Sequence, residues 1–346
     1  MFALLFILAC PKPPPEPEMP EPDVHVLHGP WEDGGRSLTV AATAPSASDS
    51  VLAGPAILVA AWVKDGDLME STSLNSGGGW TQPTRVAEGV STGDLGQVRP
   101  RVALARGGPV VAFAKDGQPQ MARRGAEGWK VSVPSPEAKG ELVDLMVFYG
   151  QPVIAWLDTR RGEHLADVYA MVDGVEEPVY IDDGDGVCAC CRPALGVVDG
   201  RVAVAFRDAD GAGRELRMAV RGDEGWEDRG PQTHGGWAPG GCPTDGPAWL
   251  GETPIVSDAR DGTRKLYRGD VVIPGSAGWQ ITQPRVVNDV VIRLESSPDR
   301  NRVVVGNYPL VGDEGTMELG DPAPLGSTIL VPWDVGGKTY LAVWQH

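Results

Sequence analysis

The segment Gly125-Ala126-Glu127-Gly128-Trp129 indicates the fold, because close variants of it recur along the chain at a nearly constant interval. The four copies occupy residues 76–80, 125–129, 222–226 and 275–279, and each ends in tryptophan. Successive tryptophans are 49, 97 and 53 residues apart, so the long interval covers two periods, and the unit near Glu177 lacks its tryptophan. Trp31 lies another 49 residues upstream and marks a further candidate unit. A fixed period of this size predicts a radial or stacked repeat architecture.

A second pattern recurs in phase with these turns. Apolar, β-rich segments occupy residues 58–62, 110–113, 153–156, 202–206 and 340–344, with weaker versions at 254–256 and 303–305. Several are followed by turns such as Asp65-Gly66 and Asp116-Gly117, which supply the positive φ that tight hairpins need. Each unit therefore contains four strands. The first precedes the apolar segment, the second and third are joined by an Asp-Gly hairpin, and the fourth follows the Gly-Trp turn. Four strands per fifty residues is typical of a propeller blade.

The predicted fold is an all-β propeller of four-stranded antiparallel blades. Seven strong segments favour seven blades, and six remains an alternative because residues 290–324 define their unit poorly. The last blade is two strands short, and residues 24–27 and 37–42 are predicted to supply both. Such sharing closes the ring and removes exposed strand edges. A pair of β-sandwiches would not explain the phased tryptophans.

Composition excludes some function classes. The chain has 346 residues with 46 glycines and 31 prolines, which suits short strands and tight turns. The formal net charge of −17 and the absence of a basic cluster argue against nucleic-acid binding, since nucleic-acid phosphates would be repelled. We expect a monomer.

The N-terminal residues predict export. Residues 1–10 form an apolar run too short to span a bilayer, placed where a signal segment belongs. Their end, Leu8-Ala9-Cys10, resembles the bacterial lipobox, which implies cleavage before Cys10 and its lipidation, although no Lys or Arg precedes the run. A plain secretory leader is the alternative. Residues 11–22 are a proline-rich spacer, and residues 23–346 form a single propeller domain. The expected location is the bacterial cell envelope, periplasmic or surface-exposed, with the membrane contacted only through the lipid.

The turn at residues 73–80 carries a family resemblance. Ser73-Leu74-Asn75-Ser76-Gly77-Gly78-Gly79-Trp80 resembles the Asp-box (BNR repeat) of the sialidase-like superfamily, with Asn75 in place of the aspartate. In that superfamily the box is a turn between outer strands, so it implies a fold and no chemistry.

A sialidase would also need three arginines that grip a carboxylate, a Tyr–Glu nucleophile pair and an acidic Asp. The resemblance offers candidates but no residue-by-residue assignment, and the Arg-Ile-Pro motif has no clear counterpart; the catalytic candidates are Arg99, Arg192, Arg207, Arg293, Asp158, Asp208 and Tyr308, with Arg101 and Glu295 as further possibilities. Arginines and aspartates beside hairpins are more often turn residues, so an enzyme is the less favoured reading.

Four cysteines form the most distinctive feature. Cys188, Cys190, Cys191 and Cys242 lie in the stretches before two innermost strands, and in an exported protein they are expected to form disulfides. The favoured bridge joins Cys242 to one of the other three, and the remaining pair could bridge locally. The alternative is a soft-metal site for copper or zinc that also uses His234, and a redox-active thiol is the third reading. No cofactor is expected otherwise.

Three functions follow from these features. The first is a binding or scaffold module for a glycan or an envelope protein. The second is a sialidase-type exo-glycosidase, favoured if three arginines converge on the channel. The third is a soft-metal or redox protein, favoured by free thiols close to His234.

Overall fold

A computed structural model describes residues 23–43, 57–92, 98–162, 165–182, 184, 186–210, 213–234, 237–239 and 245–345. The predicted leader, Cys10, the spacer at 11–22 and Cys242 lie outside these residues. Within the described part, the only helix is the short 3-10 turn η1 (Pro30–Glu32). No described helix has the length and apolar character needed to cross a membrane.

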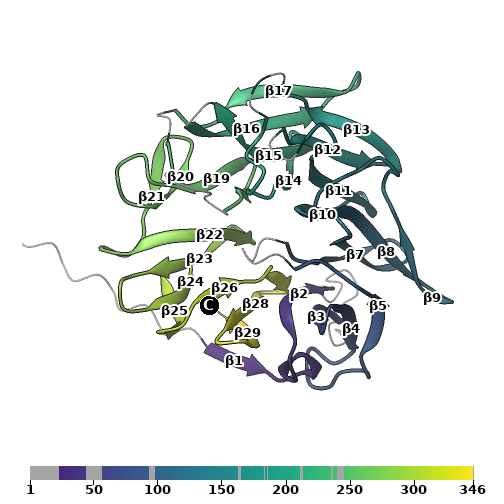
Figure 1. The fold of residues 1–346 in the computed structure, drawn as a ribbon. Coiled ribbons are helices and arrows are strands. Elements are labelled where there is room, and N and C mark those ends of the chain that lie inside the picture. The colour runs from purple at the N-terminus through teal and green to yellow at the C-terminus, as the bar shows by residue number, and fades with distance from the viewer. Residues whose placement is uncertain are drawn as a thin grey trace, which may run out of the picture.

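The strands form seven antiparallel sheets arranged around a centre, which confirms the seven-bladed propeller (Figure 1). Blades 1 to 4 contain, in order from the inside, β2 (Arg36–Ala42), β3 (Leu58–Lys64), β4 (Asp67–Ser73) and β5 (Thr84–Ala87); β6 (Arg101–Ala105), β7 (Gly108–Lys115), β8 (Gln118–Gly125) and β9 (Gly128–Ser132); β10 (Val143–Phe148), β11 (Gln151–Asp158), β12 (Asp167–Val172) and β13 (Val175–Tyr180); β14 (Ala194–Val198), β15 (Arg201–Asp210), β16 (Gly213–Arg221) and β17 (Trp226–Pro231).

The remaining blades follow the same plan, apart from the last. Blades 5 to 7 contain β18 (Ala248–Leu250), β19 (Thr253–Asp258), β20 (Lys265–Arg268) and β21 (Val271–Ile273); β22 (Gln280–Val287), β23 (Val290–Ser296), β24 (Asn301–Val305) and β25 (Tyr308–Asp313); and β26 (Met317–Leu319) with β27 (Ala323–Leu325), β28 (Thr328–Val335), β29 (Lys338–Gln345) and β1 (Asp23–Leu27).

Hairpin chemistry sets the strand boundaries. Asp65 and Gly66, between β3 and β4, have φ of 53° and 85°, and Asp116 and Gly117, between β7 and β8, have 51° and 72°. Two successive positive φ values match the twist of antiparallel strands, as the Asp-Gly pattern predicts. Tyr149 adopts φ of 47° before Gly150 in the β10–β11 hairpin, a conformation that a tyrosine seldom adopts.

The core lies between neighbouring blades. The second strand of each blade is buried on both faces, and side chains from adjacent blades share one cluster, as Val168 of blade 3 and Val204 of blade 4 do. Near the centre, the innermost strands contact one another from blade to blade, including β6 with β10, β10 with β14 and β18 with β22. Figure 1 places outer strands such as β9, β13 and β17 at the periphery.

Ring closure differs from the prediction in one respect. β1 pairs with β29 from Asp23↔Gln345 to Leu27↔Leu341, so the N-terminus does complete the last blade (Figure 1). The predicted second contribution was wrong, because residues 36–42 pair with β3 and form the innermost strand of blade 1. The error arose because residues 340–344 belong to the third strand of blade 7, not to the second, so that only one further strand was needed.

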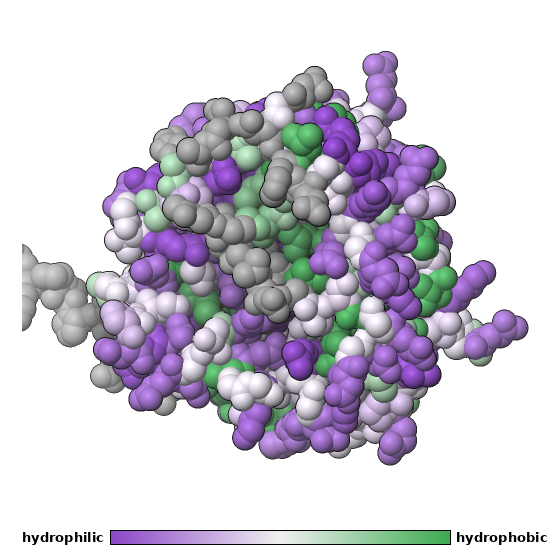
Figure 2. All heavy atoms as spheres, viewed as in Figure 1, coloured by the Kyte–Doolittle hydropathy of each residue, from purple (hydrophilic) through white to green (hydrophobic). Residues whose placement is uncertain are grey.

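The tryptophan-bearing turns keep their predicted place in three blades. Trp80 lies between the third strand β4 and the outermost strand β5, whereas Trp129 and Trp226 lie at the start of the outermost strands β9 and β17. Trp279 instead precedes β22, in the connection to blade 6. On the face shown in Figure 2, hydrophilic side chains cover most of the rim and hydrophobic ones show in smaller areas between them.

Candidate anion-binding cavity in the central channel

A small cavity opens where the innermost strands begin. Its volume is about 180 Å³, and it is lined by Arg101, Asp144, Arg192, Ala194, Leu195, Pro247, Ala248, Trp249, Arg285, Val286, Asp321 and Pro322. These residues belong to or adjoin the innermost strands of blades 2 to 7. The cavity therefore lies in the channel around which the blades are arranged.

Three arginines meet on one carboxylate oxygen in this cavity. Asp321 Oδ1 lies 2.8 Å from Arg285 Nε and 3.9 Å from Arg192 Nη2, and it also contacts Arg101 Nη1. The second oxygen, Asp321 Oδ2, is buried and accepts no hydrogen bond from any described residue. Three guanidinium groups thus surround Asp321 Oδ1, while Asp321 Oδ2 has no hydrogen-bond donor among the described residues.

Asp144 provides the second carboxylate. Its Oδ1 lies 3.2 Å from Arg101 Nε, and its Oδ2 accepts a hydrogen bond of 2.7 Å from the Leu195 N–H. Burial raises the pKa of Asp144 in spite of Arg101 and the Leu195 N–H, which act in the opposite direction. Burial therefore outweighs the arginine and the backbone donor, and the charged form of Asp144 is less favoured than it would be in water.

Among the residues that line the cavity, arginines outnumber carboxylates. Three guanidinium groups face two carboxylates along the cavity wall. Burial lowers the pKa of Arg101 to about 9, with Asp144 opposing the shift and Arg285 and Arg99 adding to it. Burial and Arg99 likewise lower the pKa of Arg285 to about 10. A further negative charge in the cavity would relieve this mutual repulsion.

Arg99 lies beside this cluster, outside the cavity lining, where its charge acts on both Arg101 and Arg285. Its side chain is 1% exposed and contacts Glu318 Oε2, and its Nη1 lies 3.6 Å from Asp334 Oδ2. Of the arginines predicted as a carboxylate grip, Arg99, Arg101 and Arg192 therefore come together.

The other predicted catalytic residues lie in contacts within and between blades. Arg207 donates to the backbone carbonyls of Asp245 and Ser257, with 3.0 Å for the first. Arg293 Nε lies 2.9 Å from Glu295 Oε1, and Glu295 also holds Arg302. Asp208 lies 3.1 Å from Arg217 Nη1, and Tyr308 begins β25, the outer strand of blade 6. None of these residues lines the cavity around Asp321.

Asp158 belongs to a contact that the fold repeats. Trp156 Nε1 donates to Asp158 Oδ2 at 2.8 Å, and Arg160 Nε donates to its Oδ1 at 2.9 Å. In blade 5, Arg260 Nε donates to Asp258 Oδ1 at the same 2.9 Å. In both blades the arginine stacks on a tyrosine of the third strand, Tyr169 at 4.2 Å and Tyr267 at 4.1 Å. Recurrence in two blades indicates a structural contact at the end of the second strand.

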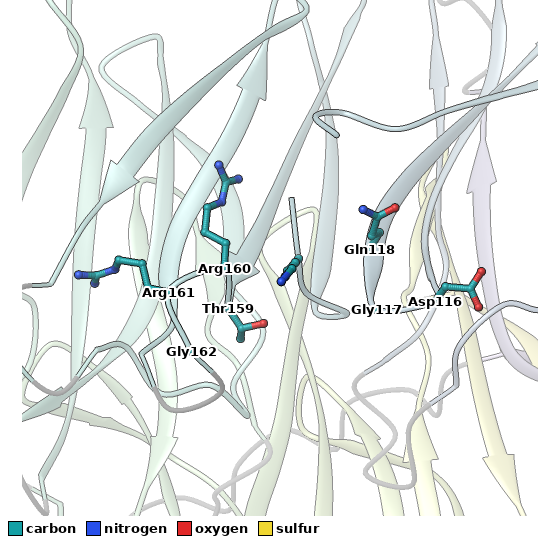
Figure 3. Close-up of a pocket in the computed structure, with 8 residues that line it drawn as sticks. Asp116, Gly117, Gln118, Thr159, Arg160, Arg161 and Gly162 are labelled. Atoms are coloured by element: carbon teal, nitrogen blue, oxygen red, sulfur yellow. The ribbon is translucent and has the colours of Figure 1, made fainter. Parts of the chain in front are cut away.

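A larger pocket between blades 2 and 3 is less suited to a ligand. Its volume is about 510 Å³, and it is lined by Asp116, Gly117, Gln118, Lys139, Thr159, Arg160, Arg161 and Gly162. Figure 3 shows Arg160 and Arg161 extending away from the Asp116–Gln118 wall. Arg160 binds Asp158 and Glu176, and Arg161 binds Asp167, so both charges are already neutralised.

The three described cysteines lie together before β14. The sulfur of Cys188 is 3.4 Å from both the Cys190 and Cys191 sulfurs, and the last two are 3.9 Å apart. A disulfide needs about 2.05 Å, so no pair among these three is bridged. Among the described cysteines, Cys188 and Cys191 are buried free thiols, and Cys190 is not a free thiol. A local bridge is therefore not formed between Cys188 and Cys191, and the favoured bridge from Cys242 lies outside the described residues.

His234 does not join the cysteines. The three sulfurs lie within 4.8 Å of one another, and no described histidine belongs to that group. The His234 ring is exposed, with Nδ1 2.9 Å from Asp270 Oδ2. The five-ligand metal site predicted as the alternative is thus not assembled with His234, and Cys242 lies outside the described residues.

Sequence reasoning missed three of the five charged residues that line the cavity. It did not single out Asp144, Arg285 or Asp321, although a signal exists. Pro100, Pro193, Pro247 and Pro322 stand just before innermost strands, and Pro284 lies within β22 where its pairing with β23 shifts register. Four of these five prolines directly neighbour Arg99, Arg192, Arg285 or Asp321. Proline is tolerated at both kinds of position, because neither the start of a strand nor a bulge needs the N–H for the ladder.

Comparisons with known proteins support the fold. The β-propeller domain of the Trilobed protease from Pyrococcus furiosus is similar over 88% of this chain and 95% of its own, with a TM-score of 0.50 and 8% identity. BBS1N, from its complex with ARL6DN, is similar over 85% of this chain and 88% of its own, with a TM-score of 0.50 and 13% identity.

A puromycin-hydrolyzing peptidase of Mycobacterium tuberculosis is similar over 82% of this chain, with a TM-score of 0.51 and 13% identity, and this chain spans 51% of it. No family model and no curated protein matches the sequence. None of the three structures named is a sialidase, so they support the propeller and not the finer sialidase-like resemblance. At these identities they show the fold alone.

Proposed function

We propose that the propeller is a binding module whose channel cavity receives a small anionic group, in the first instance the carboxylate of a glycan residue. The observation that carries this proposal is the convergence of Arg101, Arg192 and Arg285 on Asp321 Oδ1. Guanidinium groups present paired donors that match a carboxylate. A bound carboxylate would supply the negative charge that the cavity wall lacks.

The cavity also favours a ligand that donates a hydrogen bond. Asp321 Oδ2 has no donor among the described residues, and an unsatisfied buried acceptor is costly. A sugar hydroxyl beside the carboxylate would satisfy it. The volume of about 180 Å³ lies below the range of about 300–1,000 Å³ that drug-sized ligands occupy, which points to a single sugar-sized group.

The test compares acids with neutral analogues. Calorimetric titration with glucuronate, galacturonate and N-acetylneuraminate should give measurable binding to at least one, and glucose and galactose should not bind. Arg285→Met removes one cavity charge at similar volume and should weaken binding at least tenfold. Arg85→Met changes an exposed arginine, 55% accessible in its side chain, and should leave the affinity unchanged. Equal binding of acids and neutral sugars would contradict the proposal.

Sialidase-type hydrolysis is the second candidate, and the arginine convergence is the observation that favours it. A fluorogenic N-acetylneuraminic acid glycoside tests it directly. Turnover abolished by Arg285→Met would support an enzyme, whereas binding without turnover supports the module. A protein ligand of the envelope that offers an acidic side chain would use the same chemistry.

We further propose that the module is anchored in the cell envelope through lipid on Cys10, facing the periplasm or the exterior. The proposal rests on Leu8-Ala9-Cys10 and the proline-rich residues 11–22. Cys10→Ser should move the protein from the membrane fraction to the soluble fraction, and mass spectrometry should detect lipid only on the unsubstituted protein. Unlipidated, soluble wild-type protein would contradict it.

A further inference from the structure

The geometry points to a redox-active dithiol formed by Cys188 and Cys191, which takes a small-molecule disulfide as its oxidant. The two residues have the Cys-x-x-Cys spacing, and they are free thiols whose sulfurs are 3.4 Å apart. The inference does not depend on the cavity or its ligand.

The backbone already has the shape that a disulfide needs. The Cys191 N–H donates to the Cys188 carbonyl at 3.1 Å, which makes residues 188–191 a hydrogen-bonded turn. In such a turn the first and fourth Cα atoms are less than about 7 Å apart, and disulfides span about 4.4–6.8 Å. The Cys188 N–H donates to the Arg207 carbonyl at 2.9 Å, which fixes the turn against β15. Closure therefore requires only a small movement of the two sulfurs.

The surroundings distinguish the two sulfurs. The hydrogen bond with Cys191 lowers the pKa of Cys188 to about 6 against the effect of burial, with help from the Cys190 N–H and from Arg214 and Arg207. Burial raises the pKa of Cys191. Arg207 is 1% exposed, and its Nη1 has no hydrogen-bond acceptor among the described residues. A positive charge of this kind favours a thiolate nearby.

The reaction follows from this asymmetry. The Cys188 thiolate attacks one sulfur of a disulfide R–S–S–R, an S–S bond forms between protein and R–S, and the other R–S⁻ leaves. The Cys191 thiol gives its proton to that leaving thiolate. The Cys191 sulfur then attacks Cys188 Sγ, the Cys188–Cys191 bond forms, and the second R–S⁻ leaves and takes a proton from water. The protein dithiol loses two electrons and the small disulfide gains them.

The experiment uses the full chain. Protein is equilibrated in mixtures of reduced and oxidised dithiothreitol, quenched with acid, and its thiols are labelled before and after reduction with alkylating agents of different mass. We expect Cys188 and Cys191 to lose their thiols together, reversibly, with an unchanged circular dichroism spectrum. Retention of both thiols across the series, or a bridge from Cys188 to Cys190, would overturn the inference.

Single substitutions distinguish the attacking thiolate, Cys188, from the thiol that resolves the mixed disulfide, Cys191. In oxidised glutathione, Cys191→Ser should trap a mixed disulfide on Cys188, and Cys188→Ser should form one on Cys191 at least tenfold more slowly. Ala189→Ser, in the same turn, should behave as wild type. If a cysteine variant fails to fold, the labelling of wild type still decides. Stoichiometric zinc or copper that protects both thiols from oxidised dithiothreitol would overturn the inference in favour of a metal site.

Discussion

Asp321 is the residue on which the channel arginines depend. Its Oδ1 is the shared partner of Arg101, Arg192 and Arg285, and its side chain is only 12% exposed. Asp321→Asn would leave several buried positive charges without their counter-ion. Removing one partner of a buried ion pair costs about 3–5 kcal/mol.

We therefore expect the free energy of unfolding in urea to fall by about 3–5 kcal/mol in Asp321→Asn. Asp33→Asn serves as the control, because Asp33 pairs with Lys64 at the surface and its side chain is 94% exposed. Such a surface change should leave the free energy of unfolding nearly unchanged. Equal stability of the two variants would show that the channel arginines do not need Asp321.

Asp158 makes stability depend on acidity. Burial acts to raise its pKa, but hydrogen bonds from Arg160, Trp156 and the Lys139 N–H outweigh burial and lower it. A folded pKa below the unfolded value of about 3.9 stabilises the protein above that pH, and this stabilisation is lost as the pH falls through the folded pKa. Wild type should thus be more stable than Asp158→Asn at pH 6, and the difference should shrink steadily below about pH 4. Urea titrations at several pH values measure it, and a constant difference would contradict the assignment.

At the scale of the strand, close packing of neighbouring innermost strands holds the cavity in place. Trp249 of β18 lies against Gly196 of β14, where an added Cβ would come within 2.4 Å of the indole ring, and Trp249 Nε1 donates to the Ala194 carbonyl at 3.0 Å. A glycine is therefore required for the tryptophan to reach this position on the cavity wall.

Gly196→Ala should displace Trp249 and destabilise the protein by about 1–3 kcal/mol, the usual range for overpacking. A shift in tryptophan fluorescence should accompany the change. Gly125→Ala, at the exposed end of β8, is the matched control, because its nearest neighbour would be 3.9 Å from the new Cβ. If both variants unfold alike, Trp249 is not constrained by Gly196.

Near residue 177, where the repeat lacks its tryptophan, a glutamate makes the contact to the next blade. Glu177 lies in the outer strand β13 of blade 3, and its Oε2 accepts a hydrogen bond of 2.8 Å from Trp226 Nε1 of blade 4. Arg221 Nη2 lies 2.6 Å from Glu177 Oε1. At this repeat position blade 3 therefore has a glutamate, which accepts a hydrogen bond from the tryptophan of blade 4.

At the scale of the whole molecule, local patterns predicted the blades and failed where position within a blade mattered. Asp-Gly turns and apolar runs are local, so the sequence predicted seven sheets and their hairpins. Residues 303–305 and 340–344 resemble second strands in composition but lie third in their blades. Nothing local distinguishes the two places, because burial from both faces favours the same side chains in each.

The cavity was less predictable for a related reason. Arg192 is separated from Asp321 by nearly three blades along the chain, and only ring closure brings them within 3.9 Å. A single residue before each innermost strand carries little signal until the blades are aligned. The cysteines were easier to notice because all three lie within four residues, but their pairing depends on distances that the sequence does not contain.

The pairing of β1 with β29 closes the ring of blades. β1 pairs with β29 at five positions and is the outermost strand of blade 7, with four of its five residues exposed. It contributes backbone hydrogen bonds and covers an edge, and it buries little apolar surface. Without it, β29 would present unpaired N–H and C=O groups to solvent, and an exposed strand edge of this kind recruits other chains.

A chain that begins at Gly29 should therefore unfold at lower urea concentration than one that begins at Asp23, and it should form oligomers. Light scattering on the two purified chains measures the second effect. The substitution Gln345→Lys, at the exposed residue opposite Asp23 of β1, should reduce the association of the shortened chain, because charged edge residues oppose strand pairing. If the shortened chain remains monomeric and equally stable, closure by β1 is not what holds the last blade to the ring.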